Sequence, residues 1–160
     1  DAKIEGAFDQ AFAVVESVRG VRGRYNVSPA QKLVAVVSVD NEISENSVNA
    51  CKAIITELSG LETLTIAVKA PKPKFSASAV VPGGELYVPL EGILDPVAEI
   101  ARLEKEIEKA RSFAASIEKK LSNQKFVSGA PEAVVNAERV KLATQQDIIA
   151  KNEAALKELK

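Results

Sequence analysis

The side chains of this sequence that could do chemistry are cations, and they gather on one segment near the C-terminus. With Ile100 at position a of a seven-residue repeat, the outward c and f positions hold Arg102, Lys105, Lys109, Ser112, Ser116 and Lys119. The glutamates of this segment fall at other positions, where they can pair with Lys or Arg along the flanks. A row of positive charge on a rigid helix suits a sugar-phosphate backbone, which releases counterions when lysines neutralise it.

The row has a second explanation, because Lys and Arg at outward positions of a helix commonly serve solubility alone. Residues 96–160 hold 12 basic and 10 acidic side chains, against 9 and 12 in residues 1–95. The whole chain has a formal net charge of -1. Affinity for a polyanion therefore depends on where the cations are placed and not on the overall field.

Catalytic chemistry is not predicted. The sequence has no histidine and a single cysteine, Cys51, which we expect to be packed in a core. Gly83-Gly84 lacks the motif of a phosphate-binding loop, and the glutamates around Glu106 are too regularly solvated to form a general acid/base pair. We expect no catalytic residue, no metal and no cofactor in this segment. The cysteine usage and the absence of a long apolar run favour a cytoplasmic protein without a membrane span.

Two long helices are expected to position the cations. Asp95 is a suitable N-cap and Pro96 a suitable first residue for a helix whose apolar row repeats every three and four residues: Ile100, Leu103, Ile107, Ala110, Ala114, Ile117 and Leu121. Pro131 opens a second helix with apolar residues every seven positions: Val135, Leu142, Ile149 and Leu156. The second row of that helix is polar, because it consists of Glu138, Gln145 and Asn152. The spacing predicts an antiparallel hairpin of modest stability, with Phe126 and Val127 plugging its tip.

The preceding residues predict a small mixed domain. A helix is expected from Ile4 to Val21, with Ile4, Phe8, Phe12, Val15 and Val18 on its apolar face. A second helix, capped by Asn46 or Ser47, would bury Val48, Cys51, Ile54, Ile55 and Leu58 and stop at Gly60. Strands are expected at 33–39, 61–68, 75–81 and 85–89. The fold class is thus α+β, a small mixed helix/sheet domain followed by a long antiparallel two-helix coiled-coil hairpin.

Two smaller groups of cations have two interpretations each. Arg19, Arg22 and Arg24 lie at or just past the end of the first helix, where they could meet its negative end or contact nucleic acid. We favour the structural role for them. At the hairpin tip, Lys125 and Phe126 could bind and stack on a base, although a tip aromatic is more often a plug.

Three stretches resemble a known family. The segment 85–106 is similar to the junction before the C-terminal arm of valyl-tRNA synthetases, and 120–135 resembles the tip of that arm, with its Leu-Ser-Asn, Phe-Val and Ala-Pro elements. The segment 18–29 resembles the end of the anticodon-binding domain of the same family. The resemblance implies three parts: residues 1–30 as the end of that helical domain, 31–94 as an α+β junction domain, and 95–160 as a coiled-coil tRNA-binding arm.

The resemblance also implies a function. The chain would be a non-catalytic C-terminal piece of a longer protein, a bacterial-type class I aminoacyl-tRNA synthetase that uses ATP and Mg²⁺ in domains outside this segment. Its partner would be tRNA(Val), and the parent a cytoplasmic monomer with no membrane or metal partner. The residues expected to contact tRNA are Arg102, Lys105, Lys109, Lys119, Lys125, Arg19 and Arg22. The alternative is a coiled-coil protein-protein interaction module with no RNA role, in which the polar row of the second helix recruits another helix.

Overall fold

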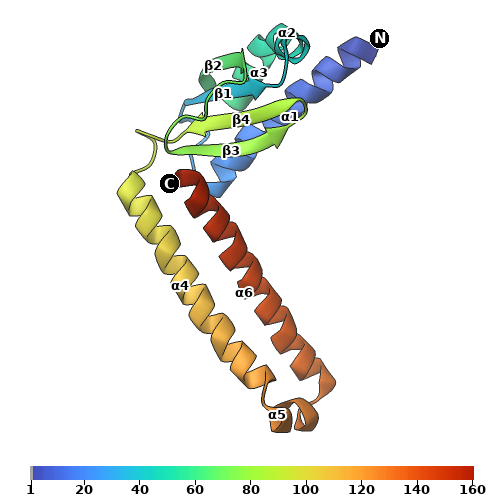
Figure 1. The fold of residues 1–160 in the computed structure, drawn as a ribbon, viewed down its shortest axis with the longest axis vertical. Coiled ribbons are helices and arrows are strands. Elements are labelled where there is room, and N and C mark those ends of the chain that lie inside the picture. Colours follow the sequence, from blue (N-terminus) through green and yellow to red (C-terminus); the bar gives the residue numbers. More distant parts are fainter. Residues whose placement is uncertain (1) are drawn as a thin grey trace. The chain divides into compact units, whose positions relative to one another are not determined.

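A computed structural model describes the backbone of residues 2–160 and the side chains from residue 5 onward. Ile4, which we expected on the apolar face of the first helix, therefore lies outside the described side chains. The chain forms two compact units, Asp1–Leu94 and Asp95–Lys160. The first contains four strands and three helices, α1 to α3, and the second contains helices α4 to α6 (Figure 1).

Helix α1 spans Ala2–Arg24, and its packing differs from the prediction. The buried residues form the row Ala11, Val14, Val15, Val18 and Val21. Phe8 and Phe12, predicted to be buried, are 45% and 58% exposed. The small Ala11 and the valines form the centre of the packed face of α1, and the two phenylalanines lie at its edge. The helix also continues past Gly20 to Arg24, and Val21 is buried in this last part of it.

The four strands form one sheet in the order β2-β1-β4-β3. They are β1 Leu33–Val39, β2 Leu61–Val68, β3 Ser76–Val81 and β4 Gly84–Pro89, close to the predicted bounds. β1 pairs in parallel with β2 and antiparallel with β4, and β3 pairs antiparallel with β4. Val37 lies opposite Ile66 on one side and Leu86 on the other, and all three are buried. Because directly paired residues share a face, this row marks the face of the sheet that forms the core.

The predicted second helix is two helices, α2 Glu42–Ala50 and α3 Lys52–Ser59, which meet at Cys51. The cap predicted at Asn46 or Ser47 is wrong. The side chain of Asn41 accepts a hydrogen bond from the amide of Ser44 at 3.0 Å, so helical structure begins earlier.

Burial on α2 and α3 follows the prediction only in part. Val48, Cys51 and Ile55 are buried as expected. Ile54 and Leu58 are each 46% exposed, and the prediction that they are buried is wrong. On α3 the buried residues are Ile55 and Ser59, and Ile54 and Leu58 each lie one residue before them, on the neighbouring row of the helix.

The second unit consists of α4 Pro96–Leu121, a short α5 Gln124–Gly129 and α6 Glu132–Leu159. The predicted N-cap is confirmed, because Asp95 Oδ1 accepts hydrogen bonds from the amides of Val97 and Ala98 at 2.9 and 3.1 Å. The predicted apolar row of α4 is buried at Leu103, Ile107, Ala110, Ala114 and Ile117. The connection between the long helices, which the sequence left without predicted secondary structure, contains α5.

Helices α4 and α6 lie side by side and run in opposite directions (Figure 1). Ion pairs between them show the direction: Glu104 pairs with Lys160 at 2.9 Å, Arg111 pairs with Glu153, and Lys120 pairs with Glu138 at 3.2 Å. In the part of the chain that the structure describes, no helix has the length and apolar character needed to cross a membrane.

The polar row of α6 faces α4, as the sequence indicated. Glu138 is buried, and Gln145 and Asn152 are half-buried. Glu138 Oε1 accepts a hydrogen bond from Lys141 Nζ at 3.0 Å and pairs with Lys120 Nζ at 3.2 Å. Hydrogen bonds from Lys141, which has the larger effect, and from Lys120 hold the pKa of the Glu138 carboxyl below its ordinary value. Two lysines thus compensate the one carboxylate buried in this row.

This arrangement predicts an acid-sensitive contribution to the stability of the helix pair. Because the pKa of Glu138 is lowered on folding, its stabilising effect is complete above the unfolded-state pKa of about 4.5 and is lost as the pH falls through the folded-state value. We expect Glu138→Gln to lower the melting temperature at pH 7, and the difference from the parent to shrink as the pH approaches 3. Thermal unfolding followed by circular dichroism measures this, with the exposed Glu132→Gln as control. A difference that does not change with pH would contradict it.

Candidate nucleic-acid interface

The lysine row on α4 is exposed to solvent. Lys105, Lys109 and Lys119 are all exposed, and none forms an ion pair with another residue that the structure describes. Lys105 and Lys119 are 14 residues apart, about 21 Å along a helix, so each would meet a different phosphate. The three ammonium groups are therefore available to an external anion.

Arg102, at the start of the predicted row, is compensated by carboxylates. It pairs with Glu99 at 2.5 Å and with Glu106 at 2.7 Å. The hydrogen bonds that Arg102 donates to Glu99, and then the charges of both glutamates, raise the pKa of Arg102. The expectation that glutamates pair with basic residues along the flanks is confirmed here. The uncompensated part of the row begins at Lys105.

The tip of the second unit carries Lys125 and Phe126 on α5. Lys125 is exposed, whereas Phe126 and Val127 are half-buried. The ammonium of Lys120 lies 4.9 Å from the centroid of the Phe126 ring, within the range of a cation-π contact. One face of Phe126 is therefore already occupied, which favours its role as a plug over stacking on a base.

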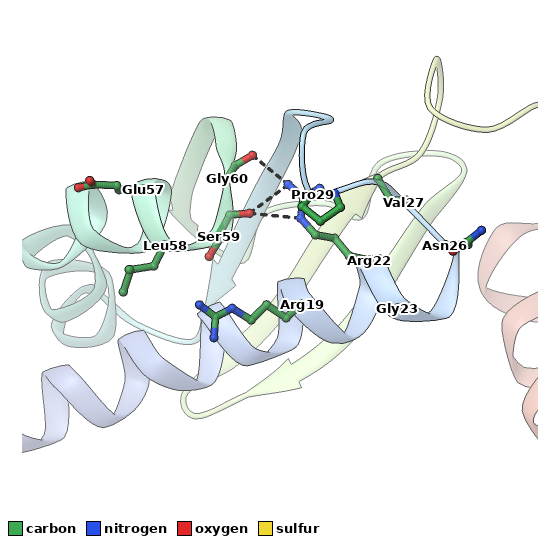
Figure 2. Close-up of a pocket in the computed structure, with 10 residues that line it drawn as sticks. All are labelled: Arg19, Arg22, Gly23, Asn26, Val27, Pro29, Glu57, Leu58, Ser59 and Gly60. Carbon is green, nitrogen blue, oxygen red and sulfur yellow. Dashed lines mark hydrogen bonds between the residues drawn. The ribbon is translucent and has the colours of Figure 1, made fainter.

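Arg19 and Arg22 line a pocket of about 580 Å³ in the first unit (Figure 2). Arg22 makes five hydrogen bonds to main-chain carbonyls: Ser28 and Gln31 in the loop after α1, and Ser59 and Gly60 at the end of α3. Arg19, one turn earlier, is exposed and points toward Leu58 without a hydrogen bond drawn to it.

Arg22 therefore ties a loop to a helix C-terminus, whose carbonyls carry partial negative charge. The structural role that we favoured is the one the geometry supports, although the helix end it caps is that of α3 and not that of α1 as expected. Its N–H groups are used inside the unit, which makes it a poor candidate for phosphate contact. Arg24 lies 6.0 Å from the Tyr25 ring centroid.

The sequence did not single out a groove between α4 and α6. Phe113 and Ile148 lie on its two sides and are 50% and 36% exposed. The sequence contained a signal for this groove, because Phe113 falls at a flanking position of the seven-residue repeat and not in the predicted buried row. A large aromatic residue at such a position remains accessible.

The described residues contain no cluster of His, Cys, Asp and Glu able to hold a metal ion. The features that they do contain are an exposed row of lysines on α4 and a groove beside it. An exposed row of cations on a helix is suited to binding a polyanion such as a nucleic acid.

Comparison with known proteins identifies the family. Residues 95–160 match the model of the valyl tRNA synthetase tRNA binding arm. Along nearly the whole chain, the sequence is similar to valine-tRNA ligases of Nitratidesulfovibrio vulgaris, 38% identical over 96% of this chain, and of Listeria innocua, 33% identical over 99%. That of Enterococcus faecalis is 35% identical over 88% of this chain. The chain belongs to the valyl-tRNA synthetase family and corresponds to its C-terminal part, which includes the tRNA-binding arm.

The chain spans about one sixth of the length of these relatives, with matches covering 17%, 18% and 16% of them respectively.

Proposed function

We propose that the second unit is an antiparallel two-helix coiled-coil arm that holds tRNA(Val) by its backbone. Lys105, Lys109 and Lys119 on α4 and Lys125 at the tip would make the phosphate contacts. Arg102 would contribute less, because Glu99 and Glu106 offset its charge. The arm would supply binding energy and orientation without taking part in the chemistry.

The longer protein would be a class I aminoacyl-tRNA synthetase, a cytoplasmic monomer that joins valine to tRNA using ATP and Mg²⁺. This segment would hold neither cofactor and no catalytic residue. Residues 1–30, 31–94 and 95–160 would be the end of the anticodon-binding domain, the junction domain and the arm. Helix α1 packs on α3 and the sheet, so residues 1–30 and 31–94 share one packed unit. The boundary at residue 30 would therefore separate two domains of the family and not two packed units of this chain.

The observation that carries the proposal is the set of three exposed lysines without carboxylate partners, within the segment that matches a tRNA-binding arm. Each lysine that neutralises a phosphate adds about one unit to the slope of log K against log salt concentration.

We expect Lys105→Gln combined with Lys119→Gln to weaken binding of a tRNA(Val) transcript by about 10- to 30-fold at 0.15 M salt and to reduce the salt slope by about 2. Fluorescence anisotropy with the 160-residue chain, across a salt series, measures both quantities. The control, Lys52→Gln with Lys157→Gln, makes the same change in net charge at exposed lysines outside the row. Equal effects of the two double variants would reject the row as the contact surface.

The alternative, a helix-recruiting module with no RNA role, rests on the polar row of α6. In the structure this row faces α4, so α6 already has a partner helix. Failure of the chain to bind the transcript at low salt would favour that alternative.

A further inference from the structure

The groove between α4 and α6 has a volume of about 890 Å³, and its lining includes apolar, polar and charged side chains. Phe113 and Ile148 provide apolar surface, Gln145 and Ser116 provide polar groups, and Lys109 provides a positive charge. The apolar residues come from both helices. The groove is thus a feature of the helix pair and not of either helix alone.

Phe113 presents an accessible aromatic surface. Its side chain is 50% exposed, and that of Ile148 is 36% exposed. Burying both fully in the helix interface would have stabilised the pair, since each apolar side chain contributes roughly 1.5 to 3 kcal/mol on complete burial. They lie instead beside the buried row, where a planar apolar ligand can cover them.

The charge around the groove suits an anionic ligand. Lys109 has no ion-pair partner among the described residues. The one carboxylate in the lining, Glu106, is occupied, because Oε1 accepts from Arg102 Nη1 at 2.7 Å and Oε2 from Asn152 Nδ2 at 3.3 Å. Toward the tip, Lys120 and Lys141 share the single charge of Glu138. Four cations, Lys109, Arg102, Lys120 and Lys141, therefore stand against three carboxylates, Glu99, Glu106 and Glu138, which leaves one net positive charge around the groove.

Gln145 provides a further polar contact. It occupies the row of α6 that faces α4, where a leucine would pack better, and it is half-buried. Its side chain makes no hydrogen bond to any residue in the described part of the chain. An amide can both donate to and accept from the edge of a base.

We propose that this groove takes a nucleobase of the bound RNA whose face is not covered by a neighbouring base. The base stacks on the Phe113 ring beside Ile148, the Gln145 amide meets its edge, and Lys109 meets an adjacent phosphate. The proposal rests on the proposed function and assigns to the arm a contact other than phosphate binding. A stacked base contributes through its aromatic face, so the contact does not depend on salt in the way that a lysine contact does.

The test compares two RNAs bound to the 160-residue chain. A tRNA(Val) transcript presents unpaired and terminal bases, whereas a continuous RNA duplex of equal nucleotide number covers almost all of its base faces. Phe113→Ala is expected to weaken transcript binding by about 5- to 50-fold and duplex binding by less than about 2-fold, with an unchanged salt slope. Phe113→Tyr is expected to restore transcript binding. Val140→Ala, at an apolar side chain that is 67% exposed and does not line the groove, is the control.

A second variant separates recognition from folding. Gln145→Leu is expected to raise the melting temperature of the helix pair while weakening transcript binding by about 3- to 10-fold. Equal loss on transcript and duplex, or no loss for Phe113→Ala while Lys105→Gln/Lys119→Gln still weakens binding, would overturn the base contact and leave the proposed function standing. A concentration-dependent dimer of the chain that Phe113→Ala abolishes would also overturn it, since the groove would then be a protein contact.

Discussion

Arg22→Ala is expected to destabilise the first unit by about 3 kcal/mol, because hydrogen bonds from a charged donor contribute more than neutral ones. The guanidinium makes five hydrogen bonds to four carbonyls on two separate segments. No other residue type carries a planar fork of donors able to make all of them, so Arg22→Lys should recover only part of the loss. Urea unfolding of the 160-residue chain, followed by Tyr25 and Tyr87 fluorescence, measures the change.

Arg19→Ala is the matched control, one turn earlier on the same helix. Arg19 is exposed and lines the same pocket without a hydrogen bond from its side chain to any residue that the structure describes, so its removal should change stability by less than about 0.5 kcal/mol. If Arg19 contacts RNA, the same variant would weaken tRNA binding at unchanged stability. Similar stability losses in the two variants would show that the carbonyl contacts of Arg22 add no stability beyond that of an exposed arginine on the same helix.

Gly84→Ala is expected to destabilise the first unit by about 3 kcal/mol through a steric clash. A Cβ at this position would lie 2.0 Å from the main-chain oxygen of Ser38 on the neighbouring strand. β1 and β4 would have to separate where Gly84 pairs with Val39, and the adjacent hydrogen bond from the Asp40 amide to the Gly83 carbonyl at 3.0 Å would be strained. Chemical unfolding gives the size of the loss.

Gly20→Ala makes the same chemical change with the opposite expected sign. Gly20 is an exposed helical residue of α1, and a Cβ there would meet no atom within 4 Å. Alanine should stabilise the helix by about 0.5 to 1 kcal/mol, because the unfolded chain loses freedom and helix propensity rises. A neutral Gly84→Ala would contradict the close approach of β1 and β4, and a destabilising Gly20→Ala would contradict the open space beside Gly20.

The strands and the two long helices were predictable because their signals are local. The β-branched run of β1, the turn at Gly83 and the Asp95-Pro96 cap each act within a few residues. The apolar period of α4 correctly predicted its five buried residues, whereas Ile100 and Leu121, at the two ends of the predicted row, are half-buried. The family resemblance was also local, since it rested on short stretches around the junction and the tip.

The errors arose where two interpretations fit the same pattern equally well. On α1, the period alone allows either Phe12 or Val14 to face the core, and packing against α3 and the sheet selects the valine. At the second helix, the prediction considered Asn46 and Ser47 as caps, whereas the hydrogen bond from the Ser44 amide identifies Asn41. A choice between neighbouring faces or caps depends on contacts that are distant in sequence.

By itself, the sequence determined the α+β class, the two long helices, the polar row of α6 and the outward position of the lysines, because helical periodicity places a side chain by its position in the chain. Only the tertiary structure showed that Glu99 and Glu106 offset Arg102, that Arg22 is held by carbonyls of Ser59 and Gly60, and that Phe113 meets Ile148 across a groove. These depend on which side chains meet across elements. The net charge and the solvent accessibility of a site depend on contacts between different elements, and the sequence of a single segment does not determine those contacts.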